Sequence, residues 1–206
     1  MTVRLAFTGA SGTGKSTLAT AIATKLALPI CPTGSREVAK AMGFDNPYDV
    51  DGAGKRAEFQ KRLFAAKAAW EHTTLDSELP FTDVHGTLAG AGHRPPPVGG
   101  FVTDRTYLDN LAYTAMHSRE TAAEPMFREV VIQAMQIYTH IVFCPVRAFH
   151  NLADDPARVS ELTYHHEYEC ILMEMLGRHV HGAPILWLTT SILGDRLLQI
   201  ERFVRP

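Results

Sequence analysis

One short run of residues has the types and spacing that bind phosphate. It reads Gly9-Ala10-Ser11-Gly12-Thr13-Gly14-Lys15-Ser16 and matches the pattern G-x-x-x-x-G-K-[ST]. In such a loop the backbone N–H groups converge on phosphate oxygens, the lysine reaches the β- and γ-phosphates, and the hydroxyl after it ligates Mg²⁺. The run therefore predicts a site for a nucleoside triphosphate with Mg²⁺. Its expected residues are Gly9, Ser11, Gly12, Thr13, Gly14, Lys15, Ser16 and Thr17.

A carboxylate and a guanidinium, Asp104 and Arg105, stand directly after a later apolar run. Phosphoryl transfer needs a carboxylate for the metal or for the attacking hydroxyl, and cations for the charge on the transferring group. Asp104 is therefore expected either to hold Mg²⁺ or to take the acceptor's proton, and the sequence leaves both roles open. It also leaves open that Asp104 caps the next helix. Arg105 is expected to clamp an acceptor oxyanion, with a surface ion pair as the alternative.

Strand-like apolar runs alternate with segments of helical periodicity along the whole chain, which predicts a parallel sheet with helices on both faces. In such a fold ligands collect at the carboxyl ends of the strands, where the glycine loop, Asp104 and Arg147 would meet. We expect a three-layer α/β fold with five strands in the order 2-3-1-4-5. The predicted strands are 3–8, 28–33, 98–103, 140–144 and 185–189, and the predicted helices are 16–28, 36–42, 53–78, 107–116, 124–138, 161–179 and 191–203.

The composition suits one α/β domain spanning 1–206, because 206 residues with 46% hydrophobic content are too few for two ordinary domains. The formal net charge of −2 calls for neither nucleic acid nor an anionic membrane. The three cysteines, Cys31, Cys144 and Cys170, contain no C-x-x-C pair. No run of about 18 apolar residues occurs, and the first strand starts too early to leave room for a signal peptide. We expect a soluble, cytoplasmic protein with no membrane partner. The sequence leaves the oligomeric state open, and a dimer is one of the alternatives.

Two long loops interrupt the pattern. Residues 79–97 are rich in glycine and proline and are too long for an ordinary connection, so they form either a lid over the acceptor or a surface insertion. Residues 146–160 are polar and carry Arg147 and Arg158. We expect this second loop to be a lid whose arginines act on the phosphates.

The chain resembles the P-loop nucleoside and nucleotide kinases. The resemblance rests on the glycine loop, on Asp104-Arg105-Thr106 with Asp109 and Ala112-Tyr113, and on Asp154-Asp155-Pro156-Ala157-Arg158. The nicotinamide riboside kinase domains are the most similar in pattern, followed by the deoxynucleoside and thymidylate kinases. The resemblance implies that Asp104 lies by the acceptor hydroxyl, that Arg105 contacts the acceptor, and that Arg147 and Arg158 close over the phosphates.

Four more residues are candidates for acceptor binding. Phe59 and Gln60 resemble the pair with which deoxynucleoside kinases stack on a base and hydrogen-bond to it, and a glutamine amide offers both a donor and an acceptor. The alternative is that Phe59 belongs to the core and Gln60 to the surface. Arg36 and Glu37, after the second predicted strand, are also expected to face the acceptor.

The leading hypothesis is an ATP-dependent kinase with Mg²⁺ that phosphorylates a hydroxyl or phosphate of a nucleoside, a nucleotide or a related acceptor. A variant is DNA modification, in which the acceptor is 5-hydroxymethyluracil in DNA, as in the phage kinases that also carry P-loops. The third hypothesis is a regulatory nucleotide-binding module or NTPase without a kinase acceptor. No N-K-x-D motif occurs, which argues against a GTPase.

Overall fold

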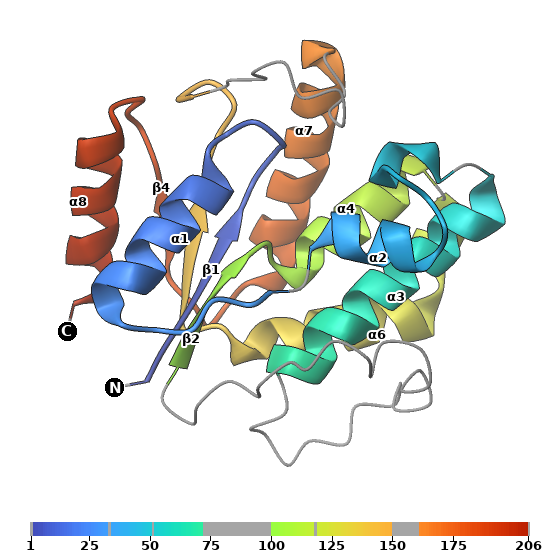
Figure 1. Ribbon diagram of the computed structural model, residues 1–206, viewed down its shortest axis with the longest axis horizontal. Helices are drawn as coiled ribbons and strands as arrows, with labels where there is room; N and C mark the ends of the chain where they lie inside the picture. The colour runs from blue at the N-terminus through green and yellow to red at the C-terminus, as the bar shows by residue number, and fades with distance from the viewer. Residues whose placement is uncertain are drawn as a thin grey trace.

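The computed structural model describes residues 2–32, 34–50, 52–71, 100–117, 119–149 and 161–205. The described strands form one parallel sheet in the order β2-β1-β3-β4. Helices cover both faces of this sheet (Figure 1). The strands are β1 (Val3–Thr8), β2 (Gly100–Asp104), β3 (His140–Phe143) and β4 (Ile185–Trp187).

The helices alternate with the strands as the sequence predicts, with small differences at those ends that the structure describes. Residues 72–78 of the helix predicted over 53–78, and residues 98–99 of the strand predicted over 98–103, lie outside the described residues. A short helix, α5, was not predicted, and the helix predicted over 124–138 is α6 followed by a 3₁₀ turn. The α-helices are α1 (Lys15–Leu26), α2 (Ser35–Ala41), α3 (Ala53–Glu71), α4 (Tyr107–His117), α5 (Arg119–Ala123), α6 (Pro125–Ala134), α7 (Leu162–His179) and α8 (Leu193–Val204), and the 3₁₀ turns are η1 (Pro47–Asp49) and η3 (Met135–Ile137).

The prediction of five strands is wrong, because the segment 28–33 does not form a regular strand. Among residues 28–32, which the structure describes, only Ile30 pairs with the sheet, in an isolated parallel bridge to Val102 of β2. The bridge has two hydrogen bonds, from Cys31 N to Val102 O and from Val102 N to Pro29 O, both 2.9 Å. Pro29 and Pro32 on either side have no N–H to donate, so they cannot extend the ladder. The four strands that do form keep their predicted relative order.

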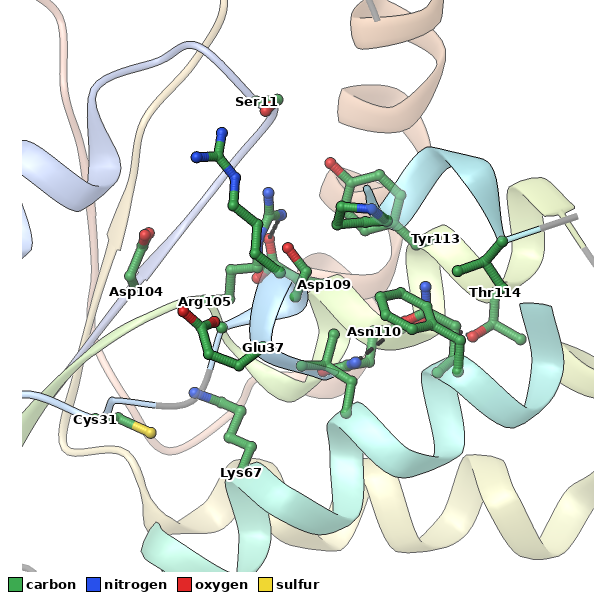
Figure 2. Close-up of a pocket in the computed structure, with 18 of the residues that line it drawn as sticks. Ser11, Cys31, Glu37, Lys67, Asp104, Arg105, Asp109, Asn110, Tyr113 and Thr114 are labelled. Carbon is green, nitrogen blue, oxygen red and sulfur yellow. Dashed lines mark hydrogen bonds and ion pairs between the residues drawn. The ribbon is translucent and has the colours of Figure 1, made fainter. Parts of the chain in front are cut away.

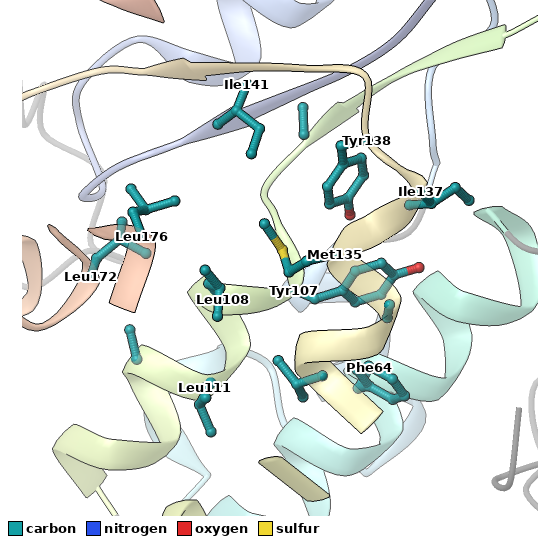
Figure 3. Packing of buried hydrophobic residues seen from close by; sticks show 14 of the residues in the cluster. Phe64, Tyr107, Leu108, Leu111, Met135, Ile137, Tyr138, Ile141, Leu172 and Leu176 are labelled. Carbon is teal, nitrogen blue, oxygen red and sulfur yellow. The ribbon is translucent and has the colours of Figure 1, made fainter. Parts of the chain in front are cut away.

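Two apolar clusters hold the layers together, one on each face of the sheet. On one face, Leu5 and Phe7 pack with helices α1 and α8. On the other, Ala6 and Ile141 pack with helices α3, α4, α6 and α7, and Figure 3 shows part of this cluster around Tyr107. Successive residues of β1 thus point to opposite faces, as a strand requires. No helix of the described residues is long and apolar enough to cross a membrane.

Candidate active site

The phosphate loop joins the end of β1 to the start of α1. Gly9 has a φ of 133°, and a Cβ atom there would lie 2.4 Å from the carbonyl oxygen of Cys144. Gly14, at the N-cap of α1, has a φ of 80°. Glycine is therefore required at Gly9 by close packing and is favoured at Gly14 by conformation. Helix α1 has no side-chain cap, so its first N–H groups remain for an anion.

Lys15 is folded back into the loop. Its side chain is buried, and its Nζ donates hydrogen bonds to Ala10 O and to Thr13 Oγ1, the latter at 3.3 Å. Burial, helped by the positive charge of Arg105, lowers the pKa of Lys15 to about 8, although Asp104 and Asp109 act to raise it. A bound polyphosphate would favour the charged form of this amine, because an anion stabilises a nearby ammonium.

Asp104 lies beside the phosphate loop because β2 pairs with β1 in a register that sets Asp104 opposite Phe7. Ser16 Oγ donates a hydrogen bond to Asp104 Oδ2. The other oxygen, Oδ1, is buried and has no hydrogen-bond partner among the described residues. The Ser16 hydroxyl and the Asp104 carboxylate, of which Oδ1 is still unpaired, are ligands that fit Mg²⁺, which prefers oxygen and keeps several waters. Ser16 and Asp104, the predicted metal residues, therefore form one oxygen-rich site.

The alternative in which Asp104 caps the next helix is wrong. Helix α4 begins at Tyr107, and its cap is the pair formed by Thr106 and Asp109. Thr106 N donates to Asp109 Oδ2 at 2.8 Å, and Asp109 N donates to Thr106 Oγ1 at 3.4 Å, which is the reciprocal arrangement of a capping box. Asp104 is thus left for another role.

Asp109 is fully buried and organises the surroundings of Arg105. Its Oδ2 accepts from the hydroxyls of Thr8 and Thr106, both at 2.7 Å, and its Oδ1 accepts from Tyr168 Oη at 2.6 Å. Arg105 Nη1 lies 3.3 Å from the same Oδ1. Arg105 therefore pairs with a buried acid and not with a surface one.

Arg105 has an unusual backbone conformation, with a φ of 150°. Its guanidinium lies over the ring of Tyr113, 5.0 Å from the centroid, and Tyr113 stacks on Tyr168 at 4.2 Å. These contacts hold the guanidinium at the wall of a cavity, where strain in a non-glycine residue is a common feature of functional sites.

The cavity has a volume of about 580 Å³ and opens beside the phosphate loop (Figure 2). The loop and β2 border it on one side, and helices α2, α3 and α4 border it on the other. The predicted residues that line it are Ser11, Ser16, Arg36, Glu37, Phe59, Gln60, Asp104 and Arg105. The structure thus gathers all the predicted acceptor residues in one place.

Gln60 is not a surface residue. It is buried in the wall of the cavity, where Asn110 Nδ2 donates a hydrogen bond to Gln60 Oε1 at 3.2 Å. Phe59 lines the cavity too, and it also packs in a small core with Val38, Val50 and Leu63. Phe59 is therefore both a core residue and a wall residue of the cavity, and the alternative that Gln60 belongs to the surface is wrong.

The predicted lid is only partly described. Arg147 is exposed, just after β3, and it is not among the residues that line the cavity. Arg158 and most of the loop 146–160 lie outside the described residues, as does the loop 79–97. Thr17 is exposed on α1 and is also absent from the cavity wall.

Sequence reasoning missed three residues near the site. Asn110 and Lys67 line the cavity, and Arg196 of α8 lies buried behind the phosphate loop, where its Nη2 donates to Thr13 O at 3.0 Å. In the sequence Lys67 is one of several cations within the helix predicted over 53–78. Its spacing of four from Leu63 and three from Phe64 could have placed it on the buried face.

Neither the comparison with protein-family models nor the comparison with curated protein sequences gives a match. Solved structures do match. The NadR protein in complex with NR has a TM-score of 0.67 at 18% identity and is matched over 98% of this chain and 51% of its own. Deoxyadenosine kinase from M. mycoides, with products dCMP and dCDP, has a TM-score of 0.60 at 14% identity, with 98% of both chains covered.

Thymidylate kinase from Candida albicans is similar as well, with a TM-score of 0.52 at 14% identity over 98% of this chain and 91% of its own. The chain spans about half the length of the two NadR chains that it matches. At these identities the likeness concerns the fold. The resemblance to P-loop nucleoside and nucleotide kinases is confirmed at that level, and this chain has their fold.

Proposed function

We propose that the protein is a kinase that uses ATP and Mg²⁺ to phosphorylate a hydroxyl or phosphate of a nucleoside, a nucleotide or a related acceptor. The observation that carries the proposal is that the phosphate loop, the Ser16–Asp104 contact and the predicted acceptor residues all border one cavity. A donor and an acceptor bound there would meet at the carboxyl ends of β1 and β2. Such positioning accounts for most of the catalysis in phosphoryl transfer.

In the proposed reaction an acceptor oxygen forms a bond to the γ-phosphorus of ATP while the bond from that phosphorus to the β–γ bridging oxygen breaks. ADP leaves with the bridging oxygen, and the hydroxyl proton passes to a carboxylate. Mg²⁺, held through Ser16 and Asp104, would neutralise charge on the phosphates. In this proposal Glu37, an exposed carboxylate that lines the cavity from α2, would take the proton.

Lys15 and Arg105 would supply the positive charge of the site. Lys15 would leave its contacts with Ala10 and Thr13 for the phosphates, and the hydrogen bonds that it gives up are local ones within the loop. Arg105 is already held by Asp109 and Tyr113 at the cavity wall, so it would meet an acceptor oxyanion with little loss of side-chain entropy. Arg147 and Arg158 remain proposed lid cations.

The Gln60–Asn110 pair supports a heterocyclic acceptor. Because Asn110 donates to the amide oxygen of Gln60, the amide hydrogens of Gln60 and the amide oxygen of Asn110 remain for a ligand. Together they offer a donor and an acceptor side by side, as the edge of a nucleobase requires. Phe59 adds an aromatic surface in the same wall. The NadR structure contains NR and the deoxyadenosine kinase structure contains dCMP, so ligands of this chemical kind occur in proteins of this fold.

An acceptor screen tests the proposal. The protein is incubated with γ-labelled ATP and Mg²⁺ and with nucleosides, nucleotides or DNA that contains 5-hydroxymethyluracil, and labelled products are separated. Transfer to a nucleoside or nucleotide, lost in Lys15→Met, is the expected result. Transfer to DNA alone would favour DNA modification. ATP binding without transfer to any acceptor would contradict the proposal and favour a nucleotide-binding module.

A further inference from the structure

Lys67 is a buried cation in the wall of the acceptor cavity. Its side chain is 5% exposed, and that of its partner Glu71, one turn later on α3, is 0% exposed. Lys67 Nζ donates to Glu71 Oε1 at 2.5 Å and to the hydroxyl of Thr103. Glu71 Oε2 accepts from Tyr138 Oη at 2.8 Å. Glu71 therefore uses both oxygens inside the protein, whereas Lys67 also borders the cavity.

A buried ion pair needs a reason other than stability. Removing two charges from water is costly, and well-packed apolar residues of similar size are often as stable or more so. The surroundings here are strongly apolar, with the rings of Tyr107, Trp70 and Phe101 in the same cluster. The position of Lys67 at the cavity wall suggests that the reason lies in ligand binding.

The ammonium of Lys67 has capacity for a ligand. A lysine offers three N–H donors, and the contacts to Glu71 and Thr103 use two of them. Nζ also lies over the ring of Tyr107, 5.5 Å from its centroid, in a cation–π contact that is not a hydrogen bond and so satisfies no N–H donor. The third N–H is thus left for the cavity that Lys67 lines.

The third donor lies close to the proposed reaction centre. Thr103, which Lys67 contacts, directly precedes Asp104 on β2, and Figure 2 shows the Lys67 amine pointing toward Glu37. Successive strand residues point to opposite faces, so Lys67 and Asp104 would approach a ligand from different sides. An acceptor hydroxyl placed between Asp104 and Glu37 would have its neighbouring atoms near Lys67.

We propose that Lys67 determines acceptor specificity by donating a hydrogen bond to a second, uncharged oxygen that the acceptor carries near its phosphorylated hydroxyl. Because Glu71 neutralises Lys67, the pair attracts an anion weakly and suits a sugar hydroxyl better than a phosphate. The acceptor class is then a nucleoside with a free sugar hydroxyl beside the reacting one. This inference rests on the proposed kinase function and narrows it.

The test removes the donor while keeping the core neutral. Lys67→Met alone would leave Glu71 as an unpaired buried carboxylate, so the variant is Lys67→Met/Glu71→Gln, in which the glutamine oxygen can still accept from Tyr138. The matched control is Arg62→Met/Glu58→Gln, which removes an i,i+4 pair from the accessible face of the same helix, where the side chains are 31% and 49% exposed. Acceptor KM, ATP KM and thermal unfolding are measured for each.

Wild type and the control are expected to have the same acceptor KM. In Lys67→Met/Glu71→Gln, the core double variant, the acceptor KM is expected to rise by roughly 10–100-fold, the range for loss of a hydrogen bond to a charged group. ATP KM should stay the same. Wild type should also lose roughly 10–100-fold in kcat/KM on one nucleoside that lacks a single sugar hydroxyl, because the same hydrogen bond is then missing. The core double variant should no longer discriminate against that analogue.

An unchanged acceptor KM in the core double variant, with discrimination intact, would overturn the inference. So would equal kcat/KM of wild type on every deoxy analogue, and this result needs no variant to fold. If wild type phosphorylates no acceptor at all, the proposed function fails first. The two failures are therefore distinguishable.

Discussion

Ser16 and Asp104 are separated by 88 positions in the sequence, and a hydrogen bond from Ser16 Oγ to Asp104 Oδ2 joins them. The contact brings a hydroxyl at the start of α1 to a carboxylate at the end of β2, and it depends on the parallel pairing of β1 with β2. It supports a shared role in holding Mg²⁺. The role of Asp104 can be tested without disturbing the fold, because Thr106 and Asp109 cap the next helix.

Asp104→Asn should lower single-turnover phosphoryl transfer by about 10²–10³-fold, the scale expected when one electrostatic contact that stabilises the transition state is lost. The thermal midpoint should change little, because Oδ1 has no partner among the described residues and asparagine keeps an oxygen for Ser16. A raised Mg²⁺ requirement would assign Asp104 to the metal. Turnover within a fewfold of wild type would contradict any direct role.

Lys15 should make the stability of the ligand-free protein depend on pH. Its pKa is about 8 in the folded protein, against the ordinary lysine value of 10.5 in the unfolded chain, so between these pH values the unfolded chain binds more protons. The free energy of unfolding should therefore rise with pH through this window. Lys15→Met should remove that rise and should abolish transfer while the protein still unfolds cooperatively. Urea denaturation at pH 7, 8, 9 and 10 gives the free energy of unfolding of wild type and of Lys15→Met. If this free energy changes with pH by the same amount in both proteins, the assignment to Lys15 is wrong.

Asp109→Ala should destabilise the protein strongly. The carboxylate accepts from Thr8, Thr106, Tyr168 and Arg105, and the substitution would leave these donors without their acceptor. With about 1 kcal/mol for each hydrogen bond and a similar amount for the helix cap, the free energy of unfolding should fall by roughly 3–5 kcal/mol. Glu174→Ala, which removes the exposed partner of Arg178, should change it by less than about 1 kcal/mol. Equal effects in urea denaturation would show that the network is not stabilising.

Two glycine substitutions should have opposite effects. Gly9→Ala places a Cβ atom 2.4 Å from the carbonyl oxygen of Cys144 at a φ of 133°, so it should destabilise the protein and weaken ATP binding. Gly177→Ala is matched in chemistry but lies inside α7, with nothing within 4 Å of the added atom. It should stabilise the protein by about 0.5–1 kcal/mol. Thermal unfolding and ATP titration of both variants give the comparison, and a loss of stability in Gly177→Ala would contradict it.

Local patterns were enough to predict the phosphate loop and most elements. The glycine spacing of the loop follows from backbone conformation, and the apolar runs and helical stripes follow from which residues a strand or a helix can bury. The end of β2 at Asp104 could also be predicted from the sequence, because a buried strand rarely continues through a carboxylate. The prediction of a strand over 28–33 was wrong because it followed the apolar residues of the segment. Pro29 and Pro32 remove the N–H donors that a strand ladder needs.

Tertiary structure alone decided which polar residues face each other. Asp109 and Thr106 have ordinary capping spacing, yet only packing against Thr8 and Tyr168 makes Asp109 the acid that holds Arg105. Gln60 and Asn110 lie 50 positions apart and meet only because α3 packs on α4. Lys67 is one of several cations on its helix by sequence, and burial with Glu71 distinguishes it from the exposed ones. Local propensity acts over a few residues, whereas a cavity is made by long-range contacts. The sequence therefore determined the loop and the fold class, and the folded chain determined the cavity in which we propose that the acceptor binds.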